Sequence, residues 1–198
     1  MSSLLAGLML GLSLIVAIGA QNIWVLSQSM AGANRLVIAV VCILCDAGLI
    51  ILGIFAASAL QQVLPSLLLW FTWAGVFILL YLAFGAAKRA WHGDSGLSLQ
   101  QVQRQPWMQT AVTALAISLL NPHVYLDTVM LLGSIGALQP EPKLFALGAC
   151  IASVLWFSSL TALAPLLRKW LSSAKRWRLF DGVIAVMLTS IAWQLTQY

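Results

Sequence analysis

The sequence predicts an all-α polytopic membrane helix bundle, with about six transmembrane helices arranged as two inverted three-helix repeats. First, 62% of the 198 residues are hydrophobic and only 8% are charged, a composition far outside the range of soluble proteins. Second, apolar runs long enough to cross a bilayer follow one another with short connections. Third, the longest polar stretch leaves three runs on each side, which gives the two halves opposite orientations.

The apolar runs place one span after another along the chain. Measured against the roughly twenty residues that a helix needs to cross hydrocarbon, they lie near residues 4–26, 36–60, 67–87, 110–134, 144–166 and 179–197. We interpret the first run as a retained helix, because it lacks the basic flanks of a cleaved leader. Residues 1–198 then form a single transmembrane domain. Its half repeats cover about residues 1–90 and 106–198, joined by a cytoplasmic loop at residues 88–109.

The charges predict the orientation of this bundle. Of ten Lys and Arg residues, only Lys143 lies in the set formed by both termini and the second and fourth loops. The positive-inside rule therefore places the odd-numbered loops in the cytoplasm and both termini outside. The basic residues are confined to segment ends and short loops, with no basic face interleaved with aromatic residues, so a nucleic-acid partner is not expected.

The most unusual stretch is the polar run from Asn121 to Asp127 inside the fourth span. A carboxylate at membrane depth costs about 3 kcal/mol on insertion scales. Pro122 cannot donate to the carbonyl of Ser118, and it suits the first position of a new half-helix capped by Asn121. Such a helix end favours an anion. His123 and Asp127 are spaced i, i+4, so they share a helix face and could form a hydrogen-bonded or proton-relay pair.

Asp127 has one counterpart, Asp46 in the second span. The other three acidic residues lie in loops or at the start of the last span. No Lys or Arg lies deep in any span, so each buried carboxylate must take up a proton, bind a cation from outside the chain, or reach water. At 1.5 Å per residue, Asp46 lies roughly 15 Å from the cytoplasmic end of its span. The competing interpretation is a protonated aspartate that hydrogen-bonds to a neighbouring helix.

The first span carries a second polar interruption, Gly19-Ala20-Gln21-Asn22. Paired interruptions in corresponding helices of two halves indicate a midplane site in transporters. Gln21 and Asn22 are therefore candidates for substrate binding, although the same side chains could instead link helices across the bundle.

Two further motifs leave alternatives open. Cys42 and Cys45 form a C-x-x-C motif that would suit a membrane thiol relay or a soft-metal carrier. The fourth span has no matching cysteine, which favours their being small apolar residues. Gly7 and Gly11 form a G-x-x-x-G motif that permits close helix contact, either within a protomer or between the protomers of a homodimer. No catalytic residue, metal site or cofactor is predicted.

Several of these segments together resemble the LysE/ArgO family of bacterial basic amino-acid exporters. They are Gly19-Ala20-Gln21-Asn22, Cys45-Asp46, the run from Leu120 to Thr128, and Glu141-Pro142-Lys143 with the Phe145-Ala146-Leu147-Gly148 that follows. The resemblance covers essentially the whole chain and is strongest to the arginine-exporter branch. It implies a bacterial inner-membrane exporter of L-arginine or L-lysine.

The resemblance also implies roles for individual residues. Asp46 and Asp127 occupy the positions of the family's functional aspartates, and Asn22, Asn121 and Pro122 lie in its characteristic segments. The family usually has proline where this chain has Ala20, which keeps its N–H group, so a milder kink is expected in the first span.

The energetics favour exchange of the substrate for protons. Moving a cation outward against an inside-negative potential costs about 2.3 kcal/mol per 100 mV, and an incoming proton cancels that cost. The prediction is therefore basic amino-acid/proton antiport, with the bilayer as the surrounding partner. The alternatives are an exporter of neutral amino acids or of a divalent metal on the same scaffold, and a thiol-redox module that uses Cys42 and Cys45.

Overall fold

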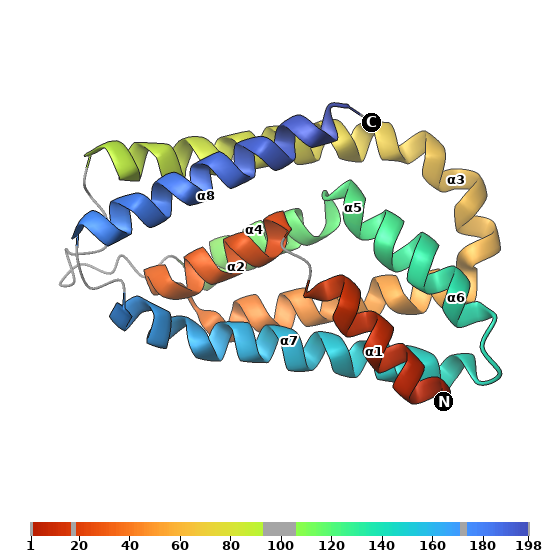
Figure 1. The fold of residues 1–198 in the computed structure, drawn as a ribbon. Helices are drawn as coiled ribbons and strands as arrows, with labels where there is room; N and C mark the ends of the chain where they lie inside the picture. The colour runs from red at the N-terminus through yellow and green to blue at the C-terminus, as the bar shows by residue number, and fades with distance from the viewer. Residues whose placement is uncertain (1, 17–18, 93–105, 171–173, 198) are drawn as a thin grey trace.

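The described chain is all-helical. The computed structural model describes residues 2–16, 19–92, 106–170 and 174–197, in which no strand occurs (Figure 1). Most of the predicted 88–109 loop therefore lies outside the described residues. In chain order the helices are α1 (Ser3–Ile15), α2 (Ala20–Ala31), α3 (Arg35–His92), α4 (Trp107–Leu119), α5 (Pro122–Val124), η1 (Tyr125–Leu132), α6 (Gly133–Ala137), α7 (Pro142–Trp170) and α8 (Ala174–Leu195).

These helices match a polytopic membrane protein. By length and composition, the described residues contain four uninterrupted helices that can span a bilayer: Arg35–Ala56, Thr72–Trp91, Pro142–Leu167 and Lys175–Leu195. Two further pairs form one span each if each bent pair crosses the membrane. The α1–α2 pair bends by 75°, and the pair formed by α4 and residues Pro122–Ala137 bends by 59°. The predicted six spans thus correspond to four long helices and two broken ones.

One predicted boundary is wrong. The sequence indicated a loop between residues 60 and 67, but the backbone there is helical and belongs to α3. The helix is interrupted earlier, at Ala56, where φ −122° and ψ 16° are not helical. Polar residues interrupt the apolar run between residues 60 and 67, but the helix continues through them. Figure 1 shows α3 reversing direction after the interruption at Ala56, so that its second part runs back in the opposite direction, beside α8.

The main helix contacts join the two halves of the chain. α1 packs along α7, η1 and α6 pack against the first part of α3, and the second part of α3 packs along α8. Glycines permit the closest approaches. A Cβ at Gly7 would meet the carbonyl oxygen of Phe145, and a Cβ at Gly148 would meet that of Leu4. The G-x-x-x-G motif of α1 is therefore used within the protomer.

A second set of cross-half contacts holds the ends of α3 and α8 together. Arg89 pairs with Asp181 at 3.0 Å, and Asp181 is almost fully buried. Arg178 donates to the carbonyl oxygens of Ala90 and Trp91 at the end of α3. The carboxylate nearest the start of the last span is therefore neutralised by a cation from the other half.

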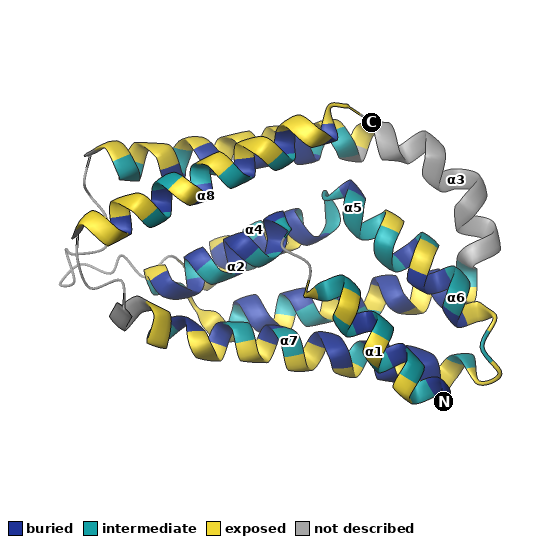
Figure 2. Cartoon of the chain, viewed as in Figure 1, coloured by how far each residue is buried: buried dark blue, intermediate teal, exposed yellow. Residues whose placement is uncertain are grey.

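The second part of the first span, α2, is an interior helix. Most of α2 is buried in the middle of the bundle, including Trp24, Val25 and Met30, whereas α7 and α8 carry exposed stripes (Figure 2). Large exposed apolar side chains such as Phe77 and Tyr81 suit contact with lipid. Helix α2 therefore fills the bundle interior on one side of the break between α1 and α2.

The glycine contact between α1 and α7 can be tested by adding one methyl group. Gly148→Ala should lower the unfolding temperature in detergent, because overpacking against the Leu4 backbone costs about 1–3 kcal/mol. Gly182→Ala on α8 is the matched control, since a Cβ there meets nothing within 4 Å. The control should be neutral or slightly stabilising. Equal unfolding temperatures for the two variants would contradict the contact.

Candidate functional site

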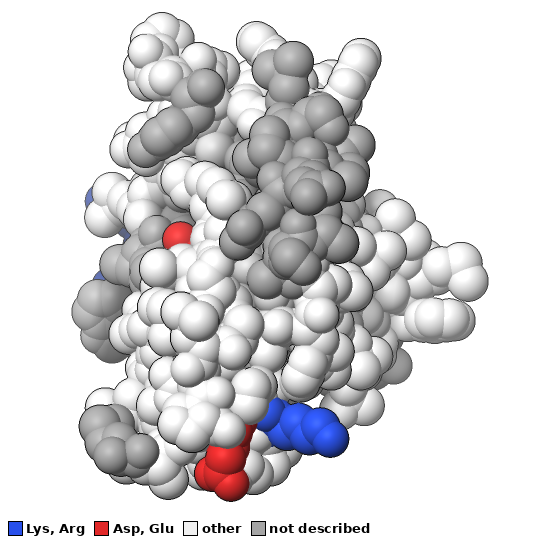
Figure 3. Space-filling model, turned by 90° about the vertical axis from the view of Figure 1, so that its right-hand side faces the viewer, with Lys and Arg blue, Asp and Glu red and all other residues white. Residues whose placement is uncertain are grey.

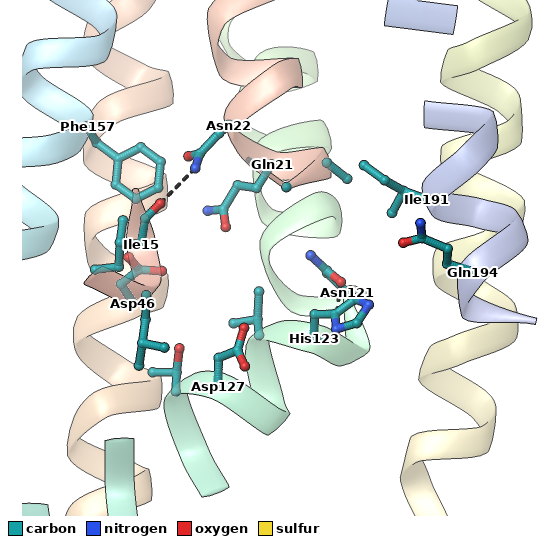
Figure 4. A pocket seen from close by; sticks show the side chains of 15 residues that line it. Ile15, Gln21, Asn22, Asp46, Asn121, His123, Asp127, Phe157, Ile191 and Gln194 are labelled. Carbon is teal, nitrogen blue, oxygen red and sulfur yellow. Dashed lines mark hydrogen bonds between the residues drawn. The ribbon is translucent and has the colours of Figure 1, made fainter. Parts of the chain in front are cut away.

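A polar cavity lies where the two broken spans meet α3 and α8. Its volume is about 280 Å³, near the lower end of the range for small-molecule sites. Figure 4 shows side chains from both broken spans and from α3, α7 and α8 converging on it. The lining residues are Leu14, Ile15, Gly19, Ala20, Gln21, Asn22, Asp46, Asn121, His123, Val124, Asp127, Thr128, Phe157, Ile191 and Gln194. Six of the seven predicted site residues are among them; only Pro122 is not.

An asparagine holds the break in the first span. Asn22 Nδ2 donates to the carbonyl oxygen of Ile15, the last residue of α1, at 2.7 Å, and Trp156 Nε1 donates to Asn22 Oδ1 at 3.0 Å. Gly19 begins α2 with an extended backbone, φ −120° and ψ 173°. The bend between α1 and α2 is 75°, and the second bend is 59°. A marked break therefore forms with alanine at position 20, and the milder kink expected relative to a proline stays a prediction. Side-chain bonds and Gly19 hold the break, so a proline is not required.

The second break follows the prediction more closely. Asn121 caps the new helix, its Oδ1 accepting from His123 N at 3.2 Å, and Pro122 occupies the first turn. Tyr125 Oη donates to the carbonyl oxygen of Leu119, the last residue of α4, at 2.6 Å. Both broken spans thus use a side chain to satisfy a carbonyl group at the end of their first helix.

The helix that begins at Pro122 offers few free N–H groups to an anion. Pro122 has no N–H, and the N–H groups of His123 and Val124 already donate to Asn121. The anion site expected there stays a prediction. The chain then continues as the π-helix η1, which carries Asp127. In the described residues, the unused helical donors that border the cavity belong instead to α2. The N–H groups of Ala20 and Gln21 donate to no described acceptor.

The two aspartates reach the cavity in different environments. Asp46 is 5% exposed, and its Oδ2 accepts a hydrogen bond from Ser153 Oγ of α7 at 2.8 Å. Asp127 is half-buried and has no hydrogen-bond partner among the described residues. Neither carboxylate is paired with a Lys or Arg of the described chain. The cavity therefore contains two acids that form no ion pair with a Lys or Arg of the described chain.

Other predicted residues have additional or different contacts. Gln21 Nε2 donates to Ser118 Oγ at 2.9 Å, so this side chain links α2 to α4 as well as bordering the cavity. His123 and Asp127 both line the cavity, and the pairing suggested by their i, i+4 spacing stays a prediction. In the view of Figure 4, the His123 ring lies near Asn121. The π-helix that begins at Tyr125 changes the register from that of the regular helix assumed.

Several residues at or beside the site were not singled out by sequence reasoning, and four of them lie outside the two broken spans. Phe157, Ile191 and Gln194 line the cavity, and Ser153 bonds to Asp46. Each is a single residue in an apolar helix without a motif. Gln194 carried one usable signal, because it is a polar residue near the outer end of a span.

The cysteines form no site of their own. Cys42, Cys45 and Cys150 are free thiols, and Ser118 Oγ donates to Cys42 Sγ at 3.9 Å. Among the described residues, no group of three or more His, Cys, Asp or Glu side chains is placed to hold a metal ion. The geometry thus adds nothing to the thiol-relay and metal-carrier alternatives.

The fold and the cavity define the class of protein: a multi-pass helical membrane protein with a polar cavity between two interrupted spans, as in membrane transporters. Comparison with known families agrees. Residues 12–198 match the LysE type translocator family, and the chain belongs to this family.

Its relatives carry a more specific name. The arginine exporter protein ArgO of Salmonella schwarzengrund (strain CVM19633) is 43% identical over 193 residues, which are 96% of this chain and 92% of the relative. The proteins of that name from Klebsiella pneumoniae (strain 342) and Enterobacter sp. (strain 638) are each 42% identical over the same shares. No solved structure matches the chain.

The account of the first break predicts that proline is tolerated at position 20. Ala20 is the first residue of α2, where proline is favoured, and its N–H is unused. Ala20→Pro should leave the unfolding temperature unchanged or slightly raised. Ile23→Pro is the control, since Ile23 N donates to Gly19 O at 3.1 Å, and it should destabilise by about 3 kcal/mol. Equal losses in both variants would contradict the position of the break.

Proposed function

We propose that the protein exports basic L-amino acids, arginine and also lysine, across the bacterial inner membrane in exchange for protons. The observation that carries the proposal is a polar cavity with two aspartates that no Lys or Arg of the described residues neutralises. The 42–43% identity to proteins named arginine exporter supports the choice of substrate.

In this proposal the cavity binds the two ends of the amino acid differently. Asp46 and Asp127 hold its cationic groups. A guanidinium matches a carboxylate in bidentate geometry, which favours arginine at such a site. Asn22 and Asn121 keep the helix breaks open, and the unused N–H groups at the start of α2 face the substrate.

Proton exchange follows from the same two acids. With no substrate, an unpaired carboxylate at membrane depth is stabilised by a proton, and a bound cation replaces that proton. Ser153 suits both states of Asp46, because a hydroxyl donates to a carboxylate and accepts from a carboxylic acid. One proton entering for each singly charged cation leaving removes the electrical cost of export.

Alternating access would come from the two halves. Each half contributes a broken span and two long helices, and the main contacts pair α1 with α7 and η1 with the first part of α3. The broken span of each half thus packs against a long helix of the other half, which supports an inverted repeat. Figure 3 shows the molecule from the right-hand side of Figure 1, with an acidic atom visible among white and grey atoms. Buried α2 residues lie on one side of the break, which supports access to the cavity from the other side.

Replacing the cavity acids tests the proposal. Asp46→Asn and Asp127→Asn should each reduce efflux of labelled arginine from proteoliposomes by about tenfold or more, through loss of a charge-assisted hydrogen bond to the cation. An imposed pH gradient should accelerate efflux through the wild-type protein only. Glu141→Gln is the matched control, since Glu141 is exposed and outside the cavity. Full arginine export by both aspartate variants, at normal membrane levels, would refute the role of the acids.

The substrate panel separates the alternatives of the same class. Vesicles loaded with arginine, lysine, a neutral amino acid or a divalent metal should release the two basic amino acids fastest. Faster release of the neutral amino acid or the metal would favour an exporter of that solute instead.

The thiol-redox alternative is separated by removing both cysteines. The variant with Cys42→Ala and Cys45→Ala should keep at least about half of the wild-type arginine export. In this proposal the two side chains contribute packing, and Cys42 also accepts a long hydrogen bond from Ser118, so their loss should cost some stability but not the transport chemistry. Export is measured in the same vesicles, with and without a reducing agent. Complete loss of activity, or a strong dependence of the wild type on the reducing agent, would favour a redox role.

A further inference from the structure

The cavity has two chemically different walls. Asp46 of α3 and Asp127 of η1 supply the acidic wall. Helix α8 supplies Ile191 and Gln194, which carry no charge. Figure 4 shows Gln194 on the side of the cavity opposite Asp46, with Asn121 between them. A basic amino acid is likewise asymmetric, with cationic groups and one carboxylate.

Gln194 is placed to meet a solute rather than the protein. It lies in the last turn of α8, where its neighbours Ala192 and Leu195 are 1% and 2% exposed and pack into the core. The Gln194 side chain is exposed, and its amide makes no hydrogen bond to any described residue. An amide that borders a cavity with both donors unused needs water or a ligand as its partner.

A neutral donor has an advantage at this position. A Lys or Arg facing the same cavity would be attracted to Asp46 and Asp127 and would compete with a cationic substrate for them. A glutamine amide donates to a carboxylate without competing for the acids. Asn121 adds a second neutral donor, because its Oδ1 is used by His123 N whereas its Nδ2 has no described partner.

From this arrangement we infer that Gln194 recognises the α-carboxylate of the substrate and makes the cavity select an amino acid over the corresponding amine. The inference rests on the proposed function, since it assumes that a basic amino acid enters this cavity. It assigns to α8 a specificity role that is separate from the binding of the cationic groups by the two aspartates.

The test compares substrates that differ only at the carboxyl group. Wild-type and variant proteoliposomes are loaded with labelled arginine, argininamide or agmatine, which lacks the carboxylate. The membrane potential is clamped at zero, so that the extra positive charge of the last two does not affect the rate. The variants are Gln194→Ala, Gln194→Glu and the control Gln197→Ala, whose side chain lies beyond the end of α8 and outside the cavity.

The wild type should export arginine faster than argininamide or agmatine. Gln194→Ala should lower this preference about tenfold, the effect of losing one hydrogen bond to a charged group. Gln194→Glu keeps the size of the side chain and places a negative charge near the carboxylate, so it should slow arginine and favour agmatine. Gln197→Ala should retain the wild-type preference.

Three results would overturn the inference while leaving the proposed function intact. The first is a wild type that exports arginine and agmatine equally well. The second is an unchanged preference in both Gln194 variants, and the third is an equal loss of export for all three compounds in these variants. A wild type that moves no arginine would instead refute the proposed function, and with it the role of Gln194.

Discussion

The structure depends on how the chain satisfies backbone groups where two helices break inside an apolar layer. Unbonded carbonyl and amide groups cost several kcal/mol each in hydrocarbon, so a break survives only where partners replace the lost helical bonds. Asn22 supplies the partner for Ile15, and Tyr125 supplies it for Leu119. These two side-chain bonds allow spans that would otherwise be continuous to turn aside and leave room for a cavity.

The breaks also explain why the acids are tolerated. Asp46 sits on a long helix, yet it borders a polar space because the broken spans leave an opening beside it. Ser153 satisfies one of its oxygens and leaves the other available. Asp127 follows the second break and is carried by a π-helix, a local geometry often found at functional sites. Each acid thus depends on the backbone irregularity next to it.

The membrane class, the spans and both acids could be predicted from the sequence, because composition and charge act over whole segments. Asn121 and Pro122 also predicted the second break, because helix capping and the missing proline N–H are local effects. The size of the first bend could not be predicted from the sequence, because Asn22 at this break accepts a hydrogen bond from Trp156, a residue 134 positions away. The π-helix and the position of Gln194 beside the cavity could not be predicted from the sequence either, because both depend on how the helices pack. The loop expected between residues 60 and 67 was a false prediction of a break. The composition becomes more polar there, but the backbone stays helical.

The glycine contact between α1 and α7 has a consequence for how the protein is made. α1 is synthesised long before α7, but the surface that its glycines fit belongs to α7, the fifth predicted span. That surface does not exist in the membrane until most of the chain has been inserted. The early helices must therefore remain loosely packed, or held by other proteins, while synthesis continues, and the cavity can close only when the second half arrives. Neither half alone should reach the native fold, whereas two separately produced halves should be able to assemble.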